Sequence, residues 1–220
     1  MSRVSAFLDP RLSEYLVHHV QSRDTLLEEL VAETDRVAPA DVDMQISPDE
    51  GALLTLLVQL RGARRAIELG TFTGYSSICI ARGLPAAGRL LCCDVSAEWT
   101  AVARRYWERA GLADRVELRL GPALATLRSL PRERAFDFAF MDAQKSEYVD
   151  YYEELVPRMT AGGLITVDNV LQDGYVADPS HADAKTARMR EFNDHVLADP
   201  RTDSLIVPIN DGLSLISVPG

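Results

Sequence analysis

The sequence predicts an α/β fold in which N-terminal helices precede a doubly wound, seven-stranded and mostly parallel sheet. From residue 65 onward, short apolar stretches alternate with stretches of helical periodicity. This alternation is typical of parallel strands covered by helices on both faces. The last two apolar stretches are separated only by residues 209–211. A connection that short forces an antiparallel hairpin, so we expect one antiparallel strand near the sheet edge.

The spacing of apolar residues predicts each element in turn. Two helices are expected over residues 11–36, a proline-containing connector over 37–48 and a further helix over 49–61. Strands are expected at residues 65–69, 89–94, 115–120, 136–141, 163–168, 203–208 and 212–217. The helices between them are expected at residues 74–84, 97–110, 121–129, 147–158 and 183–198. The length suits a single domain over residues 1–220, in which residues 1–48 extend a core formed by residues 49–220.

Composition and charge narrow the classes of partner. The net charge is −10 at pH 7, whereas nucleic-acid binders usually present a basic face to phosphates. The three cysteines, Cys79, Cys92 and Cys93, lack metal-ligand spacing and indicate reduced thiols. Neither a signal peptide nor an apolar run of membrane-spanning length is recognisable. A cytoplasmic protein without nucleic-acid or membrane partners is therefore expected.

The end of the first predicted strand has the pattern of a nucleoside site. Glu68 is followed by two glycines, Gly70 and Gly74, which open a helix. The pattern lacks the third glycine of a pyrophosphate-binding turn, so it suits a nucleoside ligand without a pyrophosphate. Ser76 and the N–H groups at the helix start could hold a ligand carboxylate. Asp94, at the end of the second strand, could accept hydrogen bonds from ribose hydroxyls or could instead cap the next helix.

Acidic side chains follow the fourth and fifth strands. Asp142 follows one strand, and Asp168 and Asn169 follow the other. If these strands are neighbours, three oxygen ligands meet at one point. Two carboxylates that close repel each other unless a cation or a proton lies between them, and three oxygen ligands suit Mg²⁺. The alternative is that both acids are ordinary loop or capping residues.

Lys145 is one of two lysines among 23 basic residues. A lysine can lose its proton whereas an arginine effectively cannot, so Lys145 is a candidate general base and otherwise a solvated surface residue. A divalent cation nearby is expected to lower its pKa.

The motifs together resemble the cation-dependent O-methyltransferase family, which includes catechol and caffeoyl-coenzyme A methyltransferases. The resemblance spans roughly residues 40–217. The matching residues are 44–48, 50–51, 68–76, 142–145, Tyr148, Tyr151, Tyr152, Glu153, 162–163, 168–171, 176–179 and 211–213.

The resemblance implies a Rossmann-like fold, S-adenosylmethionine as cofactor and a homodimer. The cofactor contacts that it implies are Met44, Glu68, Gly70, Tyr75, Ser76, Asp94, Ala123 and Asp142. It further implies Mg²⁺ or a similar ion at Asp142, Asp168 and Asn169, with Lys145 as the catalytic base. The expected substrate is a small phenolic acceptor with two adjacent hydroxyls held at the ion. Lys145 would deprotonate the hydroxyl that attacks the cofactor's methyl group in line.

Two departures from the family pattern concern Gln144, where an Asp is usual, and Gln172-Asp173, where Trp-Ser is frequent. The first affects the surroundings of Lys145. The second affects a loop that, with the N-terminal helices, is expected to shape the acceptor pocket.

Three other functions compete with this interpretation. A nicotinamide-dependent oxidoreductase needs the missing glycine and leaves Asp168-Asn169 without a role. A methyltransferase acting on RNA or protein leaves the metal ligands idle. A non-catalytic S-adenosylmethionine-binding module would be expected to lack Lys145 and those ligands.

The remaining aromatic and histidine residues are assigned to structure. The histidines have no nucleophile partner, Tyr148, Tyr151 and Tyr152 suit helix packing, and Trp107 suits the core. Trp99 could cover an adenine ring or pack against its own helix.

Overall fold

The computed structural model describes residues 7–20 and 24–220. The helices are α1 (Pro10–His18), α2 (Thr25–Val37), α3 (Pro48–Arg61), α4 (Tyr75–Gly83), α5 (Ala97–Arg109), α6 (Ala123–Ser129), α7 (Tyr148–Leu155) and α8 (Ala184–Ala198). The strands are β1 (Arg65–Leu69), β2 (Arg89–Asp94), β3 (Val116–Leu120), β4 (Phe136–Met141), β5 (Met159–Val167), β6 (Asp203–Val207) and β7 (Leu213–Val218). Short 3₁₀ turns are η1 (Val42–Met44), η2 (Ala113–Arg115), η3 (Lys145–Glu147), η4 (Val156–Arg158) and η5 (Gln172–Ala177).

The strands form one sheet in the order β3-β2-β1-β4-β5-β7-β6. β7 is antiparallel to both of its neighbours, and the pairs on the other side of it are parallel. The predicted α/β fold with one antiparallel strand is therefore confirmed. β2 and β3 are added on one side of β1, and β4 and the later strands on the other side, so the strand order reverses between β1 and β4. At such a point α/β sheets open a ligand crevice at their carboxyl edge.

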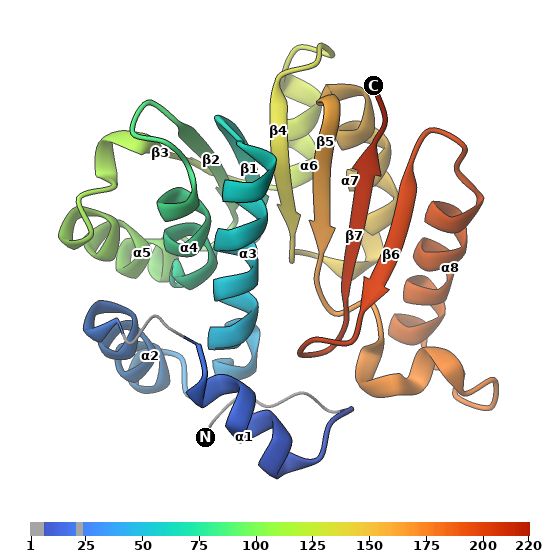
Figure 1. Ribbon diagram of the computed structural model, residues 1–220, viewed down its shortest axis with the longest axis horizontal. Helices are drawn as coiled ribbons and strands as arrows, with labels where there is room; N and C mark the ends of the chain where they lie inside the picture. Colours follow the sequence, from blue (N-terminus) through green and yellow to red (C-terminus); the bar gives the residue numbers. More distant parts are fainter. Residues whose placement is uncertain (1–6, 21–23) are drawn as a thin grey trace.

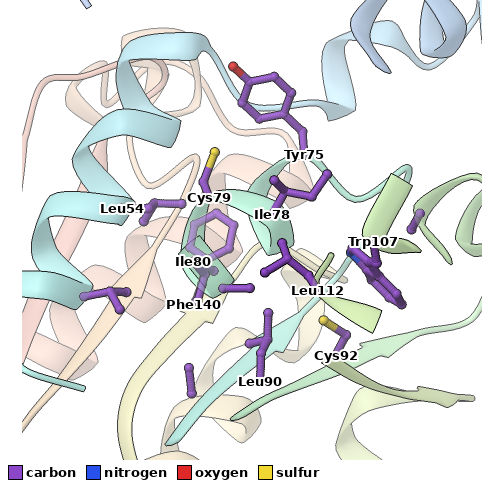
Figure 2. Packing of buried hydrophobic residues seen from close by; sticks show 14 of the residues in the cluster. Leu54, Tyr75, Ile78, Cys79, Ile80, Leu90, Cys92, Trp107, Leu112 and Phe140 are labelled. Carbon is purple, nitrogen blue, oxygen red and sulfur yellow. The ribbon is translucent and has the colours of Figure 1, made fainter. Parts of the chain in front are cut away.

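Two apolar clusters, one on each face, hold the sheet between its helices (Figure 1). The first joins α3, α4 and α5 to one face, and Figure 2 shows Trp107 packed in it near Ile78 and Leu112. The second joins α6, α7 and α8 to the other face. Cys92 belongs to the first cluster and Cys93 to the second, as the alternation of side chains along a strand requires.

The N-terminal helices α1 and α2 lie at the carboxyl edge of the parallel strands (Figure 1). The hydroxyl of Thr34 on α2 donates to Thr73 Oγ1 in the β1–α4 turn at 2.8 Å. The extension is thereby tied to the turn that the sequence singled out as a nucleoside site. In the part of the chain that is described, no helix combines the length and apolarity needed to cross a bilayer.

Two predicted boundaries differ from the structure by three residues or more. β5 was expected from residue 163 but begins at Met159, because Gly162 adopts φ +70° and the pairing with β4 continues across an irregularity there. The helix expected over residues 147–158 ends at Leu155 and continues as a 3₁₀ turn that contains Pro157. A proline has no N–H to continue an α-helical ladder.

Candidate active site

A cavity lies at the carboxyl end of β1, beside the β1–α4 turn. It is lined by Met44, Gln45, Ile46, Gly70, Thr71, Phe72, Tyr75, Ser76 and Asp142. The structure thus brings together five of the residues that the sequence predicted for the cofactor. Gln45, Ile46, Thr71 and Phe72 were missed, although each lies within two positions of a predicted residue.

Gly70 shapes this cavity because no side chain fits at its position. Its φ is +87°, and a Cβ atom there would lie 2.0 Å from the carbonyl oxygen of Asp142. The turn after β1 and the end of β4 therefore approach backbone to backbone, which only glycine allows.

Asp94 braces the same turn. Its carboxylate accepts hydrogen bonds from the backbone N–H groups of Thr71 and Phe72, both at 2.8 Å, and from Ser96 at 2.7 Å. Ser96, not Asp94, caps α5 by accepting from the N–H of Trp99. The alternative role of Asp94 as the helix cap is therefore wrong.

Glu68 and Ala123 lie outside the lining of the cavity. Glu68 is fully buried and accepts a hydrogen bond from the Thr71 hydroxyl at 2.9 Å. Burial raises the pKa of its carboxyl to about 7. Ala123 begins α6 and packs in the second apolar cluster, with 6% of its surface exposed.

Asp142 and Asp168 follow paired residues of neighbouring strands. Met141 of β4 is in register with Val167 of β5, and the N–H of Asp168 donates to the carbonyl of Met141 at 3.0 Å. Asp168 is 2% exposed. Its burial and the negative charge of Asp142 raise its pKa to about 8. The two acids are thus adjacent, as the sequence predicted.

A third acid, Glu50, was missed by sequence reasoning. It lies in the first turn of α3, is completely buried, and accepts from Asn210 Nδ2 at 3.1 Å through Oε2. Within the described residues, its Oε1 has no hydrogen-bond partner. Burial and the charges of Asp168 and Asp142 raise its pKa well above the ordinary range.

Asn169 and Gln172 lie in a loop of unusual backbone conformation. Asn169, Gln172 and Asp173 have φ values of +60°, +47° and +54°. Non-glycine residues in that region are uncommon and gather at functional sites. The side-chain amide of Gln172 donates to the carbonyl of Asn169 at 2.6 Å. This departure from the family pattern therefore supports the backbone of a predicted metal ligand.

The ammonium group of Lys145 is held by Asp142 and Tyr148. Its Nζ lies 2.5 Å from Asp142 Oδ1 and 2.9 Å from the Tyr148 hydroxyl. Burial acts to lower the pKa of Lys145, but the charge of Asp142 outweighs it and the pKa is raised. In this arrangement the ammonium group of Lys145 neutralises Asp142. The lowering of its pKa by a divalent cation stays a prediction. Gln144 makes its side-chain contact with Ser146 at 3.3 Å.

In the described part of the chain, no three His, Cys, Asp or Glu side chains converge as a metal site. The metal ligands predicted from the sequence, Asp142, Asp168 and Asn169, include only two carboxylates. The third oxygen is that of the neutral Asn169 amide. That donor set, and the gathering of the carboxyl groups of Asp142, Asp168 and Glu50 in one place, suit a hard divalent cation.

Tyr148, Tyr151 and Tyr152 are buried and pack in the second apolar cluster, as predicted. Trp107 is 2% exposed and belongs to the core. Trp99 packs edge-on against Phe72 of the cavity lining, with ring centroids 4.9 Å apart. Its aromatic ring is thus next to the cavity without lining it.

The sequence model of the O-methyltransferase family matches residues 17–218. The chain belongs to this family and is an S-adenosylmethionine-dependent O-methyltransferase. The fold and the cavity at the carboxyl edge agree with that class. An oxidoreductase and a non-catalytic module are thereby set aside.

Individual relatives narrow the comparison. The chain is 35% identical over 207 residues to probable caffeoyl-CoA O-methyltransferase 2 of Dictyostelium discoideum, covering 92% of this chain and 89% of that protein. The O-methyltransferase from Bacillus cereus in complex with SAH (S-adenosylhomocysteine) superposes with a TM-score of 0.84 at 34% identity, covering 94% and 97% of the two chains. TomG from Streptomyces achromogenes, solved with SAM (S-adenosylmethionine), gives a TM-score of 0.84 at 33% identity, covering 96% of each chain.

Proposed function

We propose that this enzyme depends on a divalent cation and methylates one hydroxyl of a small acceptor with two adjacent phenolic hydroxyls. The observation that carries the proposal is the shared position of Asp142. Asp142 lines the cavity beside Gly70, and its carboxylate accepts a hydrogen bond from Lys145. It directly follows β4, which pairs with β5, the strand that ends before Asp168. Cofactor, base and ion would therefore meet at this residue.

The proposed cofactor site is the cavity beside the β1–α4 turn. Met44, Gly70, Tyr75, Ser76 and Asp142 would contact the cofactor directly. The N-terminal N–H groups of α4 and Ser76 suit the carboxylate of the methionine portion. Asp94 would accept hydrogen bonds from the ribose hydroxyls in addition to those that it accepts from backbone N–H groups. Glu68 and Ala123 would support the site from outside its lining.

Asp142, Asp168 and Asn169 are the proposed ligands of Mg²⁺ or a similar ion. When bound, such an ion would neutralise the two carboxylates, weaken the hold of Asp142 on the Lys145 proton and favour the ionised form of a phenolic acceptor. Glu50 would lie behind this group as a buried, neutral acid.

Lys145 is the proposed general base. It would accept the proton of the acceptor hydroxyl, whose oxygen then forms a bond to the methyl carbon as the bond from that carbon to sulfur breaks. S-Adenosylhomocysteine leaves with the electron pair of that bond. The protein's own contribution is to hold the reactants in line and to accept the proton.

The acceptor class rests on chemistry and on relatives. A caffeoyl group, named in the Dictyostelium relative, carries two adjacent ring hydroxyls. Tricin synthase 1 of Oryza sativa, 40% identical over 185 residues, bears the name of a flavonoid product. Vicinal diphenols are therefore the class to test first.

The decisive experiment measures methyl transfer to matched diphenols and monophenols with Mg²⁺ and with EDTA. Activity confined to diphenols and abolished by EDTA is expected. Activity that ignores EDTA would refute the metal site, and equal activity on monophenols would refute bidentate acceptor binding. Binding of S-adenosylhomocysteine, measured in parallel, separates loss of chemistry from loss of the cofactor site.

We also propose a homodimer in the cytoplasm. The edge strand β6 exposes Leu205 (64%) and Ile206 (38%), and the end of α8 exposes Leu197 (81%). An apolar edge strand of this kind is a surface for association. The three buried, free cysteines suit a reducing compartment.

A further inference from the structure

A second concave surface is lined by residues near the amino ends of β1, β2 and β3. These ends lie at the edge of the sheet opposite to its carboxyl edge (Figure 1). The concave surface is named here the amino-edge groove. Its polar lining consists of Arg64, Arg65, Arg89, Arg115, Arg119, Asp114 and Glu117. Leu91, Leu130 and Phe136 contribute apolar side chains to its walls.

The groove exposes polar side chains of the strands themselves. Arg65, Arg89 and Glu117, near the amino ends of β1, β2 and β3, remain exposed. Arg65, Leu91 and Glu117 project from the face that bears the second apolar cluster, as the register of these strands requires.

The groove collects arginines that lack acidic partners. Most arginines that the structure describes form an ion pair with Asp or Glu. Those that form none are Arg64, Arg65, Arg89, Arg104, Arg115, Arg132, Arg134 and Arg190. Of these, all but Arg104 and Arg190 line the groove or belong to the segment between Leu130 and Phe136 beside it. In a chain of net charge −10, this is a local excess of positive charge.

Several of these guanidinium groups are held in place. Arg115 donates to the carbonyls of Ala81, Leu84 and Pro85 at 2.7, 3.0 and 3.0 Å. Arg65 lies over the Phe136 ring, 5.8 Å from its centroid. Groups that are already ordered lose less entropy when they bind an anion.

The acidic residues of the groove do not balance this charge. Glu117 pairs with Arg119 at 2.8 Å, and among the described residues the carboxylate of Asp114 forms no ion pair. The nearby Asp137 accepts from the backbone N–H groups of Arg64 and Arg65, but its ion pair is with Arg61. Arg64, Arg65 and Arg89 therefore keep their charge available to a ligand.

We propose that the amino-edge groove binds a phosphorylated small molecule that also carries a flat apolar portion. Its phosphates would contact Arg64, Arg65 and Arg89, because the planar guanidinium matches phosphate oxygens with paired hydrogen bonds. The flat portion would lie against Leu130, which is the most exposed of the three apolar wall residues, since Leu91 and Phe136 are buried. The acidic balance of the whole chain disfavours a long polyanion such as RNA.

The test titrates the protein with ADP while saturating S-adenosylhomocysteine fills the cofactor site. Calorimetry is expected to detect ADP binding, and the double variant Arg65→Ser/Arg89→Ser should weaken it by about tenfold or more. Arg104→Ser on α5 is the matched control and should leave binding unchanged. Pyrophosphate, which has the same two phosphates without the flat portion, is expected to bind more weakly than ADP.

Three results would overturn the proposal. The first is no detectable binding of ADP to the wild-type protein. The second is equal binding by the double variant, in which case the arginines serve only to balance the helix C-termini at this edge. The third is pyrophosphate binding as tightly as ADP, which removes any role of the apolar wall at Leu130. Thermal unfolding of each variant confirms that the fold is intact.

Discussion

At the scale of single residues, the catalytic proposal depends on one proton. Lys145 is bound to Asp142 and Tyr148 and holds its proton firmly in this arrangement. Its usefulness as a base therefore depends on what else binds to Asp142. Sequence reasoning identified the lysine but could not determine the balance between its burial and the charge of Asp142.

Replacement of Lys145 by Met should lower methyl transfer by about 10²–10⁴-fold, the usual contribution of a positioned base. Binding of S-adenosylhomocysteine should persist. Lys145→Arg separates charge from proton transfer, because it keeps the cation near Asp142 but cannot act as a base. A Lys145→Met enzyme that turns over with an unchanged pH profile would contradict the assignment.

The buried carboxyl of Glu68 should make stability depend on pH. Its pKa is raised in the fold to about 7 from an ordinary value of 4.5. Between about pH 4.5 and 7 the folded protein keeps this proton whereas the unfolded chain loses it. The free energy of unfolding should therefore fall as pH rises through this range. The shift corresponds to about 3 kcal/mol.

Glu68→Gln should reduce this pH dependence, measured by denaturant unfolding of the cofactor-free protein at several pH values, while Glu50 and Asp168 keep their own contributions. Glu133→Gln, on the exposed loop before β4, is the control and should retain the slope. An unchanged slope in Glu68→Gln would show that other groups cause it.

At the scale of elements, the β1–α4 turn and the end of β4 act as one unit. Gly70 allows the turn to approach Asp142, Asp94 braces the turn from β2, and Thr34 ties α2 to it. The glycine pattern and the strand-end acid predicted that a ligand would bind here. The contact from α2 depends on the path of the N-terminal extension, which no local pattern encodes.

Gly70→Ala should destabilise the protein by about 3 kcal/mol or more and abolish S-adenosylhomocysteine binding. An added Cβ meets a backbone oxygen at 2.0 Å, which no rotamer change relieves. Gly62→Ala is a matched control, since Gly62 also has positive φ (+65°) but nothing within 4 Å of the added atom. It should cost only about 1–2 kcal/mol, the penalty of the left-handed conformation. Equal melting temperatures for the two variants would show that the close approach is unimportant.

At the scale of the whole molecule, the two edges of the sheet differ in character. Acidic groups and the cofactor cavity gather at the carboxyl edge, whereas unpaired arginines gather at the amino edge. The lateral edge at β6 is apolar and exposed. Each edge thus offers a different surface for binding.

The proposed dimer should dissociate when charge is placed on β6. Leu205→Lys is expected to shift the protein from dimer to monomer in sedimentation velocity, because a buried, unpaired lysine is costly at an apolar interface. Leu60→Lys, on a leucine of α3 that is more exposed still (83%), should leave the dimer intact. A Leu205→Lys protein that remains dimeric would place the interface elsewhere.

The sequence by itself determined the fold class and five of the nine residues that line the cavity, whereas it treated the pairing of the fourth and fifth strands only as a condition. Alternating apolar stretches define parallel strands, and parallel strands bring their carboxyl ends to one edge. Asp142, Asp168, Gly70 and Asp94 could therefore be placed together without coordinates.

Only the tertiary structure decided which partners these residues have. Glu50 and Asn210 are 160 positions apart yet bonded. Gln172 reaches the carbonyl of Asn169 through an uncommon backbone conformation. The amino-edge groove collects arginines from separate strands. These contacts depend on the packing of distant segments, on burial and on local charge, which become defined only when the chain has folded.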